Sequence, residues 1–370
     1  MAPFGTLTAL SKVSLIFINE CGPEEVAYRL YPRFYISGPA VPHSKPFRIW
    51  VDLLLYPTHT LPTAAAPVLV GVGLAIHDHV FAPLPAFLGF MASWLIHVSG
   101  VLTDNYVLLS RYPEVPEHPE LLAALRKATL KLRMLRLAAT GCIAAALLTG
   151  PYLWQFAGLG AVALGCIGIG ASLGYSLGGP LSLTRLGIAD AVFFLMFGIV
   201  AVAGTYYVQA VAATGHGVVP WSAFVLGLPV GALVTNVLLI DDLRDQDFDR
   251  AKGWRTGPVR LGAHWTRCEF VVLTAFAYAM PLGFWLWVSM SPAVLLTWLT
   301  LPSAFSIART VWRSDCFSDL HPLTPRLSTV GVLYARLLAI GIAASQRSVL
   351  GWPFWQSGER RCKAWLGAAG

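Results

Sequence analysis

Five of the chain's 19 acidic residues fall within the ten positions DDLRDQDFDR at 241–250, directly after the apolar segment 232–240. On a helix, Asp241, Asp245 and Asp249 recur every four residues, so their side chains lie on one face, about 6 Å apart along the axis. Like charges at this spacing repel one another. A hard divalent cation relieves that repulsion, and Mg²⁺ prefers a few carboxylates together with water and phosphate oxygens. The cluster therefore predicts a site where magnesium and a diphosphate bind together.

Basic residues accompany these aspartates in the sequence: Arg244, Lys252, Arg255 and Arg260. Cationic side chains at such positions can bind phosphate oxygens. The alternative is a solvated helix end whose charges pair locally. A mid-membrane aspartate costs about 2.5–3.5 kcal/mol on insertion scales, so three on one face need water, a metal or a polar cavity. We therefore favour the metal–diphosphate interpretation, and we expect Asp247, which points away from the other three, to be only solvated.

The rest of the chain has the composition of a membrane protein. Of its 370 residues 56% are hydrophobic and 12% charged, and the mean hydropathy is +0.63. We expect an all-α polytopic bundle of about nine transmembrane helices around a central cavity. The apolar stretches that predict these helices are 61–76, 80–103, 134–150, 152–175, 188–211, 219–240, 269–289, 292–308 and 328–345.

Lysine and arginine residues predict the orientation of the bundle. They crowd the connections after the second, fourth, sixth and eighth spans, whereas the alternate connections contain none. By the positive-inside rule the basic connections and the aspartate site face the cytoplasm, across the inner membrane if the protein is bacterial. The net charge of +7 needs no nucleic acid to explain it, because anionic membrane lipids and a phosphorylated substrate are available counterions.

We assign one transmembrane domain, residues 46–346, with a cytoplasmic N-terminal extension at 1–45 and a C-terminal tail at 347–370. The two longest polar connections, 104–131 and 241–268, lie on the same side and four helices apart. This spacing resembles an internal duplication in which each half contributes one polar loop to a shared site. The six cysteines show no spacing typical of a disulfide framework or a zinc site.

Three further groups allow two interpretations each. Asp190 could pair with Arg185 or orient a phosphate-binding group, or it could simply meet the free N–H groups at a helix start. His97, two turns before Asp104, is typical of a satisfied interior polar residue, although it could border the cavity. The sequence HDH at 77–79 could bind metal, but it lies on the side expected to be opposite the aspartates, so we interpret it as a polar turn.

The run NVLLIDDLRDQDFDRAKGWRTGPVRLG at 236–262 closely resembles the second aspartate motif of the UbiA superfamily of intramembrane prenyltransferases. Within that superfamily it is most similar to the 1,4-dihydroxy-2-naphthoate branch of the menaquinone pathway. The stretches 175–210 and 56–75 are similar to the same branch in the same order. The resemblance implies Mg²⁺-dependent transfer of a prenyl group from an isoprenyl diphosphate to an aromatic acceptor of the quinone-precursor type.

The resemblance also implies roles for individual residues. Asp241, Asp245 and Asp249 would bind Mg²⁺ and act in catalysis. The diphosphate would meet a set of basic side chains, namely Arg244, Arg255, Lys252 and Arg185.

The first aspartate motif of the family, N-D-x-x-D followed by a further acidic residue, corresponds here to TDNYVLLSRYPE at 103–114. Asp104 and Asn105 take the place of the Asn-Asp pair in swapped order. Leu108 takes the place of the next aspartate, and Glu114 the last acidic position. The resemblance thus implies a second, weakened Mg²⁺ position held by Asp104 and Glu114, with Asn105 beside the diphosphate.

Two other functions fit parts of the sequence. A transporter or carrier of a lipid phosphate would also need a cavity and cationic side chains, but it should carry charges within several spans rather than in loops on one side. A catalytically weakened relative that binds prenyl diphosphate would fit the altered first motif. The acceptor and the prenyl chain length depend on the shape of the cavity, which the sequence does not predict.

Overall fold

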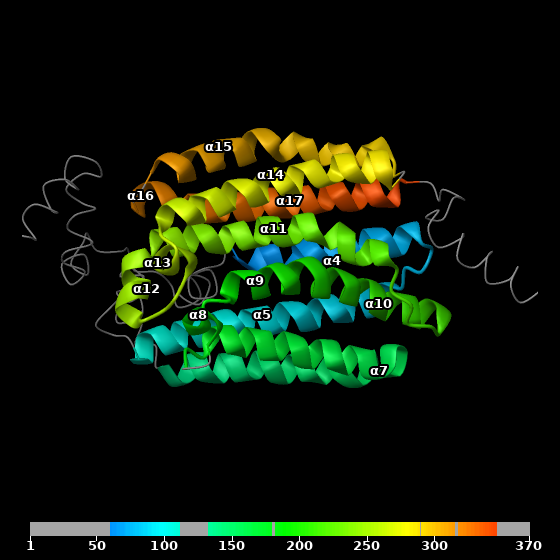
Figure 1. The fold of residues 1–370 in the computed structure, drawn as a ribbon. Coiled ribbons are helices and arrows are strands. Elements are labelled where there is room, and N and C mark those ends of the chain that lie inside the picture. The colour runs from blue at the N-terminus through cyan, green and yellow to red at the C-terminus, as the bar shows by residue number, and fades with distance from the viewer. Residues whose placement is uncertain (1–59, 112–131, 180–181, 289, 315–316, 346–370) are drawn as a thin grey trace, which may run out of the picture.

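The computed structural model describes residues 60–111, 132–179, 182–288, 290–314 and 317–345. Glu114, the N-terminal extension 1–45 and the C-terminal tail 347–370 lie outside the described residues. Within the described ranges all regular secondary structure is helical, as the sequence predicts. The long helices run side by side in one bundle (Figure 1).

The chain contains both long and short helices. The long ones are α4 (Thr60–His77), α5 (Pro83–Arg111), α7 (Leu132–Ser176), α10 (Ala201–Thr214), α11 (Trp221–Arg244), α14 (Ala263–Trp287), α15 (Leu301–Arg313) and α17 (Leu323–Ala343). The short ones are α8 (Leu183–Leu186), α9 (Ala189–Phe193), the π-helix η2 (Phe194–Val200), α12 (Gln246–Lys252), α13 (Gly257–Arg260), the 3₁₀-helix η3 (Pro292–Thr300) and α16 (Phe317–Leu320).

Seven helices of the described ranges are long and apolar enough to cross a membrane, and α4 adds a shorter apolar one. The longest, α7, contains the non-helical Gly158 (φ 57°, ψ −148°). Ser99 of α5 donates a hydrogen bond to the Ala139 carbonyl (2.9 Å), and Ser172 donates one to the Ile96 carbonyl (3.2 Å). Because both ends of α7 meet the same stretch of α5, α7 folds back at Gly158 as two antiparallel arms. These arms are the expected third and fourth spans.

Helix α11 is the centre of the bundle. Of the 18 consecutive residues that make α11 apolar enough to span a membrane, 83% are buried. The helix packs against α4, η2, α14 and α17. A helix that is apolar all round is typical of a protein core or of a membrane span, and α11 is covered mainly by protein. Since the aspartate cluster begins at the end of α11, the packing of the core fixes the position of the cluster.

Glycines let α11 approach η2 closely. A Cβ atom on Gly227 would lie 1.6 Å from the Gly198 carbonyl oxygen, and one on Gly231 would lie 2.7 Å from the Phe194 oxygen. Small residues allow this kind of contact between helices in membranes. The contact anchors η2, a π-helical segment of a kind often found at functional sites.

The short helices α8, α12, α13 and α16 gather at one end of the bundle (Figure 1). They follow the fourth, sixth and eighth spans, so these polar connections share one side, as expected. The HDH run lies at the opposite end, where His77 Nδ1 shares a hydrogen bond with the Ser345 carbonyl (2.9 Å) and Asp78 accepts one from Tyr206 (2.8 Å). These contacts support its interpretation as a polar turn.

We expect Gly227→Ala to lower the thermal unfolding midpoint in detergent, because the added methyl group would overlap the Gly198 carbonyl. Overpacking of this kind costs about 1–3 kcal/mol. Gly165→Ala in α7 is the matched control, since a Cβ there meets nothing within 4 Å. Equal midpoints for the two variants would contradict the close crossing of α11 and η2.

Candidate active site

The aspartate cluster spans the junction of α11 and α12. Helix α11 ends at Arg244, Asp245 has φ −101° and ψ 14°, and α12 begins at Gln246. The prediction that one continuous helix carries the three aspartates is therefore wrong. The backbone N–H of Asp245 still bonds to the Asp241 carbonyl, and that of Asp249 to the Asp245 carbonyl, both at 2.9 Å. As a result all three residues still line one pocket.

This polar pocket has a volume of about 60 Å³. Asp104 and Asn105 of α5 line it together with the aspartates of α11 and α12, so residues of both predicted motifs meet in one site. The full lining is Asp104, Asn105, Leu108, Tyr175, Thr184, Asp241, Asp242, Arg244, Asp245, Asp249, Trp254 and Thr256. Leu108 thus places an apolar side chain among five aspartates.

Arg244 holds two of these aspartates together. Its Nη1 donates to Asp241 Oδ1 (2.6 Å) and its Nε to Asp245 Oδ1 (2.8 Å), while Nη2 bonds to the other Asp245 oxygen. Only 2% of the Arg244 side chain is exposed. Thr324 of α17 also donates to Asp241 Oδ1 (2.9 Å). The guanidinium was expected to meet the diphosphate, and here it forms charge-assisted bonds within the cluster.

Asp249 has its own set of partners. The Lys252 Nζ lies 3.2 Å from Asp249 Oδ1, and the Thr256 hydroxyl donates to Asp249 Oδ2 at 2.9 Å. The same ammonium group sits 3.7 Å from the ring centroid of Trp254, a favourable cation–π contact. Lys252 is therefore a buried counter-charge to Asp249.

Three of the predicted phosphate ligands, Lys252, Arg185 and Arg255, lie outside the lining of the polar pocket, whereas Arg244 and Asn105 belong to it. Arg255 is exposed, and its backbone N–H bonds to the Thr184 carbonyl (2.9 Å). Arg185 Nη2 donates to the Lys252 carbonyl (3.4 Å). These contacts tie α8 to the end of α12 and to the chain just after it. The Arg185 side chain makes one of them, whereas Arg255 takes part only through its backbone.

Asp242 is the residue that the sequence reasoning missed. It lines the polar pocket and is 6% exposed, and its Oδ2 has no hydrogen-bond partner among the described residues. The fourfold spacing of the other aspartates excluded it from the expected face. Its place beside Asp241, directly after the apolar run 237–240, was the available signal that it is buried.

The donor set of the pocket suits a hard cation. Within the described ranges no group of three or more His, Cys, Asp or Glu residues is arranged to hold a metal ion by itself. Mg²⁺, however, usually takes one or two carboxylates and completes its shell with water and phosphate oxygens. Carboxylate oxygens line the pocket, and that of Asp242 is unpartnered, so the residues fit a cation shared with a phosphate ligand.

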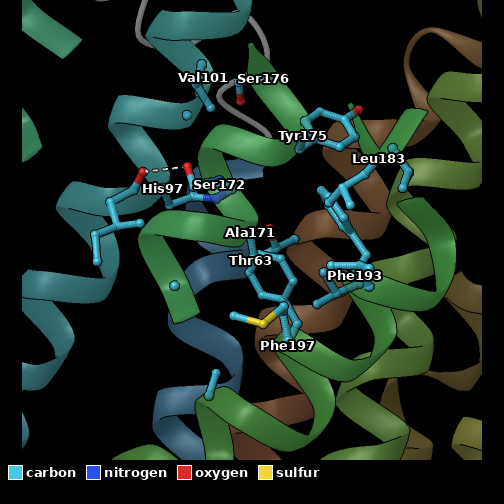
Figure 2. A pocket seen from close by; sticks show the side chains of 18 of the residues that line it. Thr63, His97, Val101, Ala171, Ser172, Tyr175, Ser176, Leu183, Phe193 and Phe197 are labelled. Atoms are coloured by element: carbon cyan, nitrogen blue, oxygen red, sulfur yellow. Dashed lines mark hydrogen bonds between the residues drawn. The ribbon is translucent and has the colours of Figure 1, made fainter. Parts of the chain in front are cut away.

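A larger, mostly apolar cavity of about 190 Å³ adjoins the polar pocket. Residues of α4, α5, the second arm of α7, η2 and α11 line it (Figure 2). Three residues, Asp104, Tyr175 and Asp241, line both spaces. The site therefore joins a polar head-group pocket to an apolar chamber.

A row of rings follows the wall of the apolar cavity. The ring centroids of Tyr175 and Phe193 are 5.1 Å apart, those of Phe193 and Phe197 are 5.4 Å apart, and those of Phe197 and His97 are 5.9 Å apart. Figure 2 shows these side chains converging on the cavity. His97 thus borders the cavity, the second of its two expected roles.

Asp190 lies close enough to Asp242 of the polar pocket for the two carboxyl groups to interact electrostatically. Its Oδ1 is buried without a hydrogen-bond partner among the described residues, and the positive charge of Arg260 lies near it. Arg260 Nη1 donates to the Gly187 carbonyl (2.7 Å). This arrangement joins the α8–α9 turn to α13, a second link between the same two segments that Arg185 and Arg255 connect.

Residues 64–320 match the model of the UbiA prenyltransferase family. The chain belongs to this family. A 1,4-dihydroxy-2-naphthoate octaprenyltransferase of Haemophilus influenzae is 27% identical over 296 residues, which cover 76% of this chain and 92% of that protein. Prenyl transfer is therefore the reaction class of this UbiA-family enzyme.

Solved structures of UbiA homologs share the fold. One, an apo structure from Aeropyrum pernix K1, has a TM-score of 0.54 at 16% identity and covers 76% of this chain and 96% of that one. Another, from Archaeoglobus fulgidus and bound to DMAPP and Mg²⁺, has a TM-score of 0.51 at 16% identity and covers 78% and 98%. The UbiA-type helical bundle predicted from the sequence is thus confirmed.

We expect Arg244→Gln to destabilise the folded protein by about 3–5 kcal/mol, because it leaves the buried carboxylate of Asp245 and the partly buried one of Asp241 without their shared cation. Thermal unfolding in detergent measures the change. Arg250→Gln is the matched control, since Arg250 forms an ion pair with Asp247 (3.2 Å) in which both side chains are more than half exposed, and such pairs contribute little. Similar midpoints for the two variants would show that Arg244 does not hold the cluster together.

Proposed function

We propose that this enzyme transfers a prenyl group from an isoprenyl diphosphate to an aromatic acceptor inside the membrane. Its cofactor would be Mg²⁺, bound together with the diphosphate. The observation that carries the proposal is the junction of a carboxylate-lined pocket with an apolar cavity through Asp104, Tyr175 and Asp241. An isoprenyl diphosphate has a matching charged head and apolar chain. The name of the Haemophilus influenzae relative supports a naphthoate-type acceptor.

The polar pocket would receive the diphosphate head. Carboxylates from both motifs would hold Mg²⁺, chiefly Asp241, Asp242, Asp245 and Asp249, with Asp104 across the pocket. When bound, the cation would neutralise the diphosphate and favour its departure. The five aspartates outnumber the two buried cations, Arg244 and Lys252, that pair with them. The pocket therefore holds more carboxyl groups than internal cations, and such groups can bind a divalent cation.

Arg244 and Lys252 act on the carboxylates rather than on the substrate. Each is buried and bonded to an aspartate, so each fixes the direction of a carboxylate before any ligand binds. Preorganised charge of this kind stabilises a developing charge without rearrangement during the reaction. This role replaces the direct diphosphate contact that the family resemblance implied for them.

The apolar cavity would receive the start of the prenyl chain. Ionisation of the donor leaves an allylic cation, and the π-faces of Phe193, Phe197 and Tyr175 can stabilise a cation without reacting with it. The apolar wall also excludes water, which would otherwise capture the cation. The acceptor ring must approach from the same cavity, because its nucleophilic carbon has to reach the carbon that loses the diphosphate.

We also propose that the site faces the cytoplasm. The positive-inside distribution supports this side, since the basic connections after the fourth, sixth and eighth spans gather at the end of the bundle that carries the aspartates (Figure 1). A lipid-phosphate carrier is disfavoured because its charged residues should occur within several spans rather than mainly in connections on one side.

We expect Asp245→Asn to lower Mg²⁺-dependent diphosphate release by at least about a hundredfold, since it removes one charge from the centre of the preorganised cluster. The assay measures diphosphate release from an isoprenyl diphosphate in the presence of acceptor. Asp247→Asn is the control, because 59% of the Asp247 side chain is exposed and it lies outside the lining of the pocket. Near-parental activity of Asp245→Asn, with unchanged Mg²⁺ dependence, would overturn the proposed metal site.

We expect Leu108→Asp to tighten apparent Mg²⁺ binding and to speed prenyl transfer by roughly tenfold, the effect of about 1.4 kcal/mol on the barrier. Leu108 lies one turn after Asp104 and lines the same pocket, so the new carboxylate would restore the ligand that the first motif lacks. Leu108→Asn, which adds no charge, is the control. A slower Leu108→Asp enzyme would mean that Leu108 packs against substrate in a rebuilt site.

A further inference from the structure

The wall of the apolar cavity contains a polar stripe on α5. Ser93, His97, Gly100 and Asp104 all line the cavity, and their spacing of four, three and four residues places them on one face of the helix. Asp104 belongs to the polar pocket as well. His97 is seven residues earlier, an axial distance of about 10 Å. The stripe therefore carries hydrogen-bonding groups from the diphosphate end deep into the apolar chamber.

The other polar side chains of the lining are Thr63 of α4, Ser172, Tyr175 and Ser176 of α7, and Asp241 of α11. On α11, Val234 is also seven residues before the shared Asp241, and together with Val237 and Leu238 it forms an apolar wall. Ser172 already donates to the Ile96 carbonyl (3.2 Å). A buried polar group on a ligand in this cavity can thus meet His97 and Ser93 of α5, with Thr63 of α4 in the same lining.

The ring of His97 also ends the aromatic row. Its plane is at 87° to that of Phe197, with centroids 5.9 Å apart, an edge-to-face contact that restricts how the imidazole can turn. Phe193 and Phe197 lie between His97 and Tyr175 in this row. An aromatic ligand placed beside these phenyl rings would have the imidazole at one end and the carboxylate pocket at the other.

We propose that His97 binds an oxygen substituent of the aromatic acceptor and so orients the acceptor ring beside Phe193 and Phe197. This inference rests on the proposed function. A phenolic or carboxylate oxygen buried in an apolar cavity without a partner costs free energy, and His97 supplies the partner. A site built to bond such an oxygen also rejects aromatic compounds that lack it, so His97 determines acceptor specificity.

The first experiment measures KM for each substrate, with 1,4-dihydroxy-2-naphthoate as the acceptor probe. His97→Phe keeps the ring and its edge contact but removes the hydrogen bond, so we expect acceptor KM to rise about tenfold, equivalent to about 1.4 kcal/mol. KM for the isoprenyl diphosphate should stay unchanged. His97→Gln, which retains a donor and an acceptor, should recover most of the loss. His216→Phe, at an exposed position in the loop before α11, is the control.

A second experiment removes the partner atom from the ligand. Binding of 1,4-dihydroxy-2-naphthoate and of 2-naphthoate is compared without prenyl diphosphate. The parent should prefer the dihydroxy compound about tenfold, and His97→Phe should lose that preference. If His97→Phe does not fold, His97→Leu makes the same comparison.

The outcomes separate this inference from the proposed function. An active His97→Phe enzyme with parental acceptor KM and parental preference between the two probes would overturn the role of His97 alone. A parent enzyme that transfers prenyl groups to no aromatic acceptor would overturn the proposed function and this inference with it.

Discussion

Several carboxylates are held close together at the end of a buried helix. The neighbouring cations and the packing around that helix offset the repulsion between them. Left alone, the aspartates of α11 and α12 would repel one another and unwind the helix end. Arg244 and Lys252 offset part of that repulsion from within the protein. The remaining repulsion is contained because α11 is covered on all sides by its neighbours, so the helix end cannot move away. The tight crossing of Gly227 and Gly198 is one source of that rigidity.

The sequence predicted the parts of the fold and site that depend on one-dimensional patterns. Apolar stretches located the helices, and the fourfold spacing located the main aspartates. It placed the turn between the third and fourth spans near residue 151, however, whereas the chain turns at Gly158. Pro151 remains inside the helix, which membrane helices tolerate. The turn occurs where a glycine can adopt a positive φ.

What the sequence could not predict depends on contacts between distant segments. Tyr175, Phe193 and Phe197 look like ordinary apolar residues of three different segments, and only packing brings them to one cavity. The basic residues are a second example. Gly253 ends α12 with φ 71°; Lys252, just before it, is buried, whereas Arg255, two residues after it, is exposed.

The two arms of α7 link the site to its lipid surroundings. Of the 18 consecutive residues that make α7 apolar enough to span a membrane, only 11% are buried. Even so, Ala171, Ser172 and Tyr175 of its second arm line the cavity. Side-chain hydrogen bonds hold both arms to α5, the first arm through Ser99 and the second through Ser172. Bilayer thickness acts on such lipid-facing helices through tilt. We therefore expect the acyl-chain length of the lipid to change the volume of the cavity through the tilt of α7. The rate of prenyl transfer should then depend on the detergent or lipid.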